Sequence, residues 1–250
     1  MPRRITTLTF DLWNTLYSDT GVASGVVKPR RLALLNELLA SRGVDPSEDE
    51  LLQAYRASFD AYMTAWTTGA HFGAREHLAF ILDYFHAREA KSAAEREEFE
   101  RVVRATEDAL ALAPPNLLPG VRETIPALAV AGYRLGIISD TSLTPGRVLK
   151  EFLKNDGLLD CFSTFTFSDE TGFPKPDPRM FEVTLAGLGA RPAEAAHIGD
   201  TPRTDIAGAR ALGMITIRCA GSADHPEPPE ADFVITDHRE IPAILEKLAG

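Results

Sequence analysis

The sequence has little cysteine and no long apolar run. Cys161 and Cys219 are its two cysteines, too few for a disulfide framework, so a reducing cytoplasm is the simplest setting. No stretch approaches the roughly 18 consecutive apolar residues that cross a bilayer. The start MPRRITTLTFDLW holds no apolar run long enough for a secretory signal. We therefore expect a soluble cytoplasmic protein with no membrane partner.

The sequence also lacks an excess of positive charge. Its formal net charge is -10, spread along the chain, and would repel a nucleic-acid backbone over most of the surface. We therefore predict no nucleic-acid partner. A local site can still accept a small anionic substrate, because it can oppose the global charge. With 44% hydrophobic and 25% charged residues, the chain has the balance of a globular protein. Nothing in the pattern indicates an oligomeric state.

The hydrophobic pattern changes twice along the chain. Residues 5–10 (ITTLTF) are β-branched and aromatic and predict a buried strand that ends at Asp11. From about residue 28 to 112 apolar residues recur at helical spacing, and two prolines at 114 and 115 stop the pattern. Strands and helices then alternate. We expect strands at 133–139, 162–168, 195–199, 214–219 and 233–236, with helices at 121–131, 145–155, 178–189 and 204–212 and a terminal helix.

Strands that alternate with helices of this length indicate βαβ units and hence a parallel sheet covered on both faces. The predicted fold class is therefore α/β, a doubly wound parallel sheet with an inserted all-helical domain. The α/β core would consist of residues 1–18 and 113–250. The helical insertion would consist of residues 19–112.

Polar residues stand where the predicted strands end. In open parallel sheets ligands bind beyond the carboxyl ends of the strands, and Asp11, Ser139, Lys175 and Asp200 each follow a strand, with Asp205 five residues after Asp200. Taken singly, each of these residues is also expected of an ordinary turn or helix cap. Their joint occurrence, in this order, indicates a functional site.

With these residues the chain resembles the haloacid dehalogenase-like hydrolase superfamily. FDLWNTL is similar to the first motif of that superfamily, IIS to the second, KPDPRMF to the third and IGDTPRTDIAGARALGM to the fourth. The helical insertion stands where many members have a helical cap. The resemblance implies a Rossmann-like core and a hydrolase with Asp11 as the covalent nucleophile.

The resemblance also implies a Mg²⁺ cofactor and a role for each site residue. Asp11, Asp200 and the backbone carbonyl of Trp13 would hold the Mg²⁺, with Asp205 in support; Lys175 and Ser139 would grip the transferred group; Asp140 and Asn14 would contact the substrate. The chemistry is consistent with these roles. A carboxylate can divide one displacement into two through a covalent intermediate. The charge of a phosphoryl group is neutralised by a metal ion on hard oxygens and by a lysine.

The chain departs from the phosphatases of the superfamily at Trp13, where their pattern has a second Asp that acts as general acid and base. Asn14 stands in place of the usual Gly, and Asp140 in place of the usual Asn. An indole has no proton to exchange at neutral pH, and general acid and base catalysis contributes about 100- to 10,000-fold. Dehalogenases of the superfamily resemble this chain in having an aromatic residue at that position, since the departure of halide needs no proton.

Three functions stay open on these residues. Mg²⁺-dependent hydrolysis of a small-molecule phosphate ester comes first, because Asp200 and Asp205 would repel Asp11 if no cation lay between them. Dehalogenation of a 2-haloacid comes second. A catalytically degenerate binding or regulatory protein comes third. His71 and His77 have no cysteine nearby to suggest zinc. Two interpretations of these histidines and Arg75 stay open: they line the face of the helical cap over the active site, or they are ordinary solvated residues of the helices.

Overall fold

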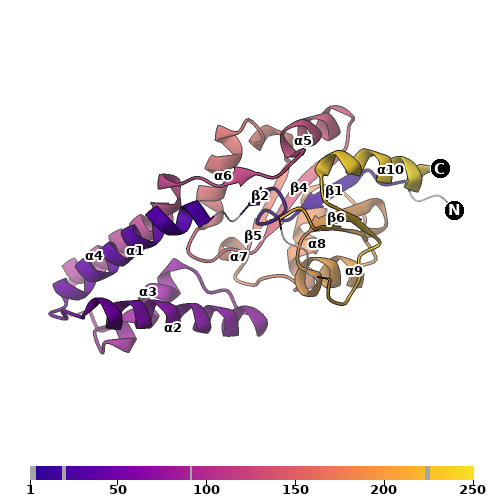
Figure 1. Ribbon diagram of the computed structural model, residues 1–250. Helices are drawn as coiled ribbons and strands as arrows, with labels where there is room; N and C mark the ends of the chain where they lie inside the picture. Colours follow the sequence, from indigo (N-terminus) through magenta and orange to yellow (C-terminus); the bar gives the residue numbers. More distant parts are fainter. Residues whose placement is uncertain (1–3, 19–20, 91, 223–225) are drawn as a thin grey trace. The chain divides into compact units, whose positions relative to one another are not determined.

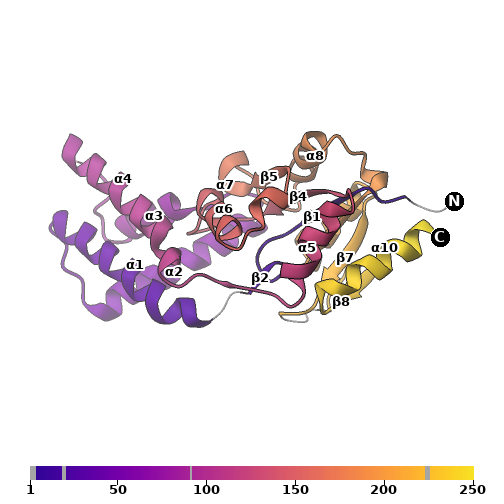
Figure 2. The same cartoon turned by 90° about the horizontal axis from the view of Figure 1, so that it is seen from above.

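The computed structural model describes residues 4–18, 21–90, 92–222 and 226–250, without the side chains of 21–24. The chain divides into two compact units (Figures 1 and 2). The first, an α/β unit, contains Met1–Asp19, Pro115–Asp140 and Lys150–Gly250; the second, a helical unit, contains Thr20–Pro114 and Thr141–Leu149. Within the described residues, no helix is both long and apolar enough to cross a membrane.

The α/β unit is built on a six-stranded sheet in which every neighbouring pair of strands is parallel. Its strands are β1 (Thr7–Phe10), β4 (Arg134–Ser139), β5 (Thr164–Phe167), β6 (Ala195–Gly199), β7 (Ile215–Cys219) and β8 (Phe233–Ile235). They lie in the order β5-β4-β1-β6-β7-β8. The first strand of the chain is therefore a central strand, and all four of its residues are buried.

Helices cover both faces of this sheet (Figure 1). On one face lie α5 (Val121–Val130) and α10 (Ile241–Ala249), and on the other lie α8 (Pro178–Gly187) and α9 (Ala207–Ala211). Shorter elements are α7 (Ser168–Thr171), the 3-10 turns η2 (Leu159–Cys161), η3 (Pro192–Glu194) and η5 (His238–Glu240), and the π-helical turn η4 (Pro202–Ile206). The helix α6 (Gly146–Asn155) runs from one unit into the other. The predicted α/β fold class is confirmed.

A short ribbon lies where the chain leaves and re-enters the α/β unit. β2 (Tyr17–Ser18) pairs antiparallel with β3 (Asn116–Leu117), and the backbone N–H of Leu118 donates to the carbonyl of Leu16 at 2.9 Å. The two ends of the inserted segment are thus tied together by backbone hydrogen bonds. Two-residue strands carry no periodic pattern, so hydrophobic periodicity does not predict them.

The helical unit consists of α1 (Gly21–Ser41), α2 (Glu48–Thr67), α3 (Ala74–Tyr84), α4 (Ala93–Asp108) and the 3-10 turn η1 (Ala109–Leu112). Its core is a cluster of leucine, isoleucine, valine and alanine side chains with one tyrosine, Tyr55. The start of α2 is fixed by a capping box in which Ser47 and Glu50 each bond the backbone of the other. The helix α1 begins before the predicted pattern does, which leaves Pro29 inside it.

The segment Thr141–Leu149 begins two residues after the end of β4, yet it packs within the helical unit. The hydroxyl of Ser142 lies 3.1 Å from Nε2 of His77, and the guanidinium of Arg31 donates to the hydroxyl of Thr144 at 3.0 Å. The alternation of strands and helices in the sequence assigns this segment to the α/β core. Hydrophobic periodicity does not indicate which unit a loop packs against. That the helical unit acts as a cap stays a prediction.

Two buried histidines make the free energy of unfolding depend on pH. Burial, with the charges of Arg31 and His71, lowers the pKa of His77 to about 3, and burial lowers the pKa of His238 to about 4. In the unfolded chain a histidine titrates near pH 6.5, so as the pH falls the unfolded state is protonated before the folded state. This protonation stabilises the unfolded state relative to the folded state. We expect each histidine to reduce the free energy of unfolding by about 2 kcal/mol between pH 7 and pH 5.

Urea unfolding at the two pH values measures this loss. His77→Gln keeps a polar side chain that does not titrate, so this variant should lose about 2 kcal/mol less than the wild type over the same interval. An identical loss in both proteins would contradict the role assigned to His77.

Candidate functional site

The ends of three neighbouring strands bring polar residues to one edge of the sheet. Phe10, the last residue of β1, is in register with Ile137 of β4 and with Ile198 of β6. The N–H of Asp11 donates to the carbonyl of Ile198 at 2.8 Å, which extends the ladder by one residue. Asp11 and Asp200 therefore emerge side by side, as expected at the carboxyl edge of a parallel sheet.

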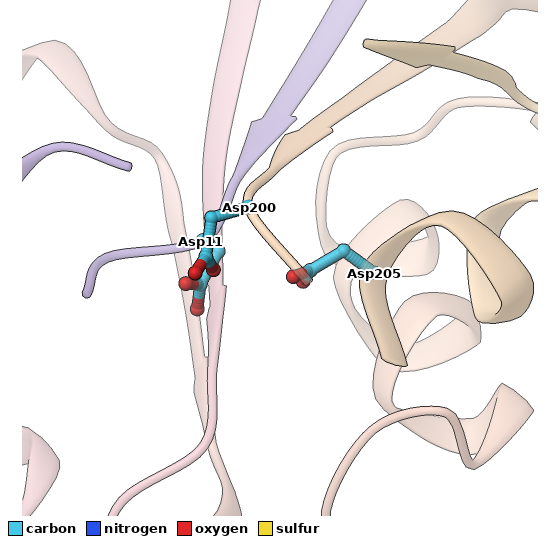
Figure 3. Close-up of side chains that lie close together, drawn as sticks. All are labelled: Asp11, Asp200 and Asp205. Carbon is cyan, nitrogen blue, oxygen red and sulfur yellow. The ribbon is translucent and has the colours of Figure 1, made fainter. Parts of the chain in front are cut away.

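Three carboxylates face one another at this edge (Figure 3). One oxygen from each of Asp11, Asp200 and Asp205 lies within 4.8 Å of the other two. Asp205 comes from η4 and points back toward the strand ends (Figure 3). Its approach depends on Gly199, because a Cβ atom at that position would overlap the carboxyl group of Asp205. Residues from two strand ends and one turn thus form a single acidic cluster.

Lys175 joins this cluster from the loop that precedes α8. Its ammonium donates to Oδ1 of Asp11 and to Oδ1 of Asp205, each at 2.6 Å, and to the carbonyl of Ile138 at 3.0 Å. Its backbone N–H donates to Oδ1 of Asp140 at 2.8 Å. The side chain is buried, with 2% of the residue exposed. The structure therefore brings together four of the residues singled out in the sequence: Asp11, Lys175, Asp200 and Asp205.

Burial and mutual repulsion govern the charges of the cluster. Burial raises the pKa of Asp11, and so does the charge of Asp205, although Lys175 acts the other way. Burial, with Asp205 and Asp11, raises the pKa of Asp200 to about 8. For Asp205 burial is outweighed by Lys175 and by a hydrogen bond from His197, which hold its pKa below the usual range.

The pKa of Lys175 lies above its ordinary value. Burial alone would lower it, but the charges of Asp11, Asp205 and Asp140 outweigh burial. Lys175 is therefore a charged ammonium at neutral pH, and it is shared by Asp11 and Asp205.

The donor set fits a divalent cation with hard ligands. With all three carboxylates ionised, as metal binding requires, the cluster carries two negative charges more than its one ammonium balances. Burial and this repulsion raise the pKa of Asp11 and of Asp200, and a bound cation would relieve the repulsion. Carboxylate oxygens are the ligands that Mg²⁺ prefers. The oxygens of Asp205 already accept hydrogen bonds from Lys175, from His197 and from the N–H of Thr201. Asp11 and Asp200 are therefore better placed than Asp205 to bind a metal ion directly.

The other predicted site residues lie close by in the chain. Ser139 ends β4, and its buried hydroxyl donates to the carbonyl of Asp140 at 3.4 Å. Asn14 has a φ of 53°, and its side-chain oxygen accepts from the hydroxyl of Ser222 at 3.0 Å. Trp13 is half-buried, and its backbone pairs with Tyr17 in an isolated bridge. The roles assigned to Ser139, Asp140, Asn14 and the Trp13 carbonyl stay predictions.

The sequence reasoning missed His197. It lies in the middle of β6, in register with Thr9 of β1, and is fully buried. Its Nε2 atom lies 3.1 Å from Oδ1 of Asp205 and its Nδ1 atom 2.9 Å from the hydroxyl of Thr9. The signal in the sequence is a titratable residue inside the apolar strand AAHIG, and polar residues at strand ends alone do not include it.

Comparisons with known proteins bear on this site. The family model of haloacid dehalogenase-like hydrolases matches residues 5–213. The glyceraldehyde 3-phosphate phosphatase of Methanopyrus kandleri is 29% identical over 248 residues, which cover 96% of this chain and 97% of that protein.

Two solved structures share the fold. A phosphatase of the same superfamily from Thermococcus onnurineus aligns with a TM-score of 0.65 at 22% identity, over 96% of this chain and 98% of that one. A 2-haloacid dehalogenase from Pseudomonas syringae pv. Tomato aligns with a TM-score of 0.67 at 24% identity, over 98% of this chain and 100% of that one. The family model spans most of the sequence and shows that the chain belongs to the haloacid dehalogenase-like hydrolases.

Proposed function

We propose that this hydrolase cleaves a phosphate ester of a small molecule with Asp11 as nucleophile and Mg²⁺ as cofactor. The observation that carries the proposal is the cluster of three carboxylates around one ammonium. Its excess of negative charge requires a cation before a further anion can bind. The similarity to the Methanopyrus glyceraldehyde 3-phosphate phosphatase supports a small phosphorylated substrate.

In the first step a carboxylate oxygen of Asp11 attacks the phosphorus, and the bond from phosphorus to the ester oxygen breaks. Lys175 donates to Oδ1 of Asp11, which orients the carboxylate for this attack. The products of this step are an aspartyl-phosphate and an alkoxide, which takes its proton from solvent because Trp13 has none to give. A water molecule then attacks the phosphorus of that intermediate, which regenerates Asp11 and releases inorganic phosphate.

The other residues of the cluster balance charge and hold the reacting groups in place: Lys175, Asp200 and Asp205. The ammonium of Lys175 stabilises negative charge on the transferred group while it orients Asp11. A bound Mg²⁺ would neutralise the remaining charge of the phosphoryl oxygens and would be held by Asp11 and Asp200. Asp205 would keep Lys175 in place. We also propose that the protein works in the cytoplasm, as its low cysteine content suggests.

Dehalogenation of a 2-haloacid is the second candidate, and Trp13 is the observation that favours it. The same oxygen of Asp11 would attack the carbon that bears the halogen, halide would leave, and water would hydrolyse the resulting ester. Halide leaves without a proton, so the lack of an acid at position 13 costs this reaction nothing. The similarity to the solved 2-haloacid dehalogenase shows a shared fold and does not bear on the reaction.

A substrate screen with and without Mg²⁺ separates the two candidates. We expect phosphate release from 4-nitrophenyl phosphate, glyceraldehyde 3-phosphate or phosphoserine in the presence of Mg²⁺, and its loss on chelation with EDTA. Asp11→Asn should reduce this turnover about 1,000-fold or more, because it removes the nucleophile. Chloride release from 2-chloropropionate in EDTA, without any phosphate release, would replace the first candidate by the second.

The second test concerns the acid and base that Trp13 does not supply. Trp13→Asp places a carboxyl group two residues after the nucleophile, where it can protonate the leaving oxygen and activate the attacking water. We expect it to increase kcat for glycerol phosphate about 100-fold or more over the wild type. The increase should be smaller for 4-nitrophenyl phosphate, whose leaving group needs no proton.

Trp13→Asn is the matched control, since it removes the same ring and offers no acid. Thermal melts of both variants show whether they are folded. A folded Trp13→Asp that is no faster than Trp13→Asn would show that the missing acid does not limit this enzyme.

A further inference from the structure

The proposed reaction makes no use of His197, although this residue is bonded to the active-site cluster. Its imidazole is completely buried in the central part of the sheet, and the ring of Phe181 packs against it in a T-shaped contact with ring centroids 5.1 Å apart. Each ring nitrogen has a polar partner, Thr9 on one side and Asp205 on the other. A histidine held at both nitrogens has a defined orientation.

The chemistry of the two partners selects one tautomer. The Asp205 carboxylate accepts hydrogen bonds and cannot donate, so Nε2 must carry the proton. The hydroxyl of Thr9 can donate, and Nδ1 at 2.9 Å is its nearer acceptor; the carbonyl of Ala196 lies at 3.5 Å. A neutral imidazole with its proton on Nε2 satisfies both contacts.

This bond completes the fixation of Asp205. Oδ1 of Asp205 accepts from His197 and from Lys175, and Oδ2 accepts from the N–H of Thr201 at 3.0 Å. The carboxylate is thus held in one plane, and Gly199 leaves room for it there. Rotation of the carboxylate would carry Oδ1 away from the ammonium, which lies 2.6 Å from both Asp205 and Asp11.

We propose that His197 is a positioning residue: through Asp205 it holds the Lys175 ammonium against the nucleophile Asp11, and Thr9 fixes the tautomer that does so. The effect on catalysis rests on the proposed function, in which Asp11 and Lys175 carry the phosphoryl transfer. The tautomer of His197 and the position of Lys175 do not depend on the proposed function.

Two variants of similar size separate positioning from packing. His197→Gln can place an amide N–H close to the position of Nε2 and so donate to Asp205. His197→Asn is one carbon shorter and cannot reach it. For Mg²⁺-dependent hydrolysis of 4-nitrophenyl phosphate we expect kcat to fall about 10- to 100-fold in His197→Asn with KM little changed, as for a lost hydrogen bond to a charged group.

His197→Gln should recover most of that loss, and Thr9→Val, which removes only the donor to Nδ1, should lose less than His197→Asn. Thermal melts establish that the variants are folded. Equal losses of kcat in folded His197→Gln and His197→Asn would overturn the proposal, because a residue needed only for packing would give that result.

Two measurements on the metal-free protein do not depend on turnover. The ¹⁵N chemical shifts of the His197 ring should be those of the neutral Nε2–H tautomer, and an Nδ1–H tautomer would overturn the assignment. The rate of reductive methylation of Lys175 can be measured by mass spectrometry, with the exposed Lys154 as the internal reference. We expect this rate to be higher in His197→Asn than in the wild type or in His197→Gln.

Unchanged methylation of Lys175 in His197→Asn would overturn the positioning role. If the wild type hydrolyses no phosphate ester, the proposed function fails, while the ring tautomer and the reactivity of Lys175 still decide whether His197 positions the lysine.

Discussion

The hydrogen bonds of the buried Lys175 ammonium are the interaction on which the candidate site depends. Three acceptors from β4, from the residue after β1 and from η4 converge on this one nitrogen. Removal of one member of a buried ion pair costs more than the pair contributes, because it leaves a charge without a partner. The same ammonium therefore joins three segments of the chain and sets the charge beside the nucleophile. Stability and reactivity cannot be varied independently at this point.

The topology of the sheet explains why so few residues suffice. A parallel sheet brings the carboxyl ends of its strands to one edge, so β1 and β6 deliver Asp11 and Asp200 without any long loop. Only Lys175 and Asp205 must reach back to this edge. Gly199 makes the return of Asp205 possible, since any side chain there would occupy the space of its carboxyl group. The geometry of the cluster is thus fixed by backbone ladders more than by side-chain packing.

Much of this arrangement could be predicted from the sequence. The strand at 195–199 was predicted with the observed bounds, and the strand predicted at 214–219 begins one residue later, at Ile215. Polar residues at strand ends were sufficient to select Asp11 and Asp200, because periodicity locates strands and parallel topology aligns their ends. Lys175, in the loop after a predicted strand, and Asp205, five residues after Asp200, joined the same group by position, and the resemblance to known motifs suggested a role for each.

The remaining features depend on contacts that a linear pattern does not encode. The helix predicted at 204–212 is in fact the π-helical turn Pro202–Ile206 followed by α9, a wider turn whose Asp205 bonds back to the N–H of Thr201. His197 was missed because its importance lies in two partners, one of them 188 residues away in the chain. Which unit a loop joins is also decided by tertiary contacts, as residues 141–149 show.

The membership of Thr141–Leu149 in the helical unit has a consequence for recombination between relatives. A chimera that exchanges only Thr20–Pro114 would separate the donor helices from a segment that shares their core, where Leu143 is buried with residues of α1 to α4. It would also separate Arg147 from its partners Glu107 and Asp108. A functional transplant of the helices must therefore be discontinuous, with Thr141–Leu149 exchanged together with Thr20–Pro114.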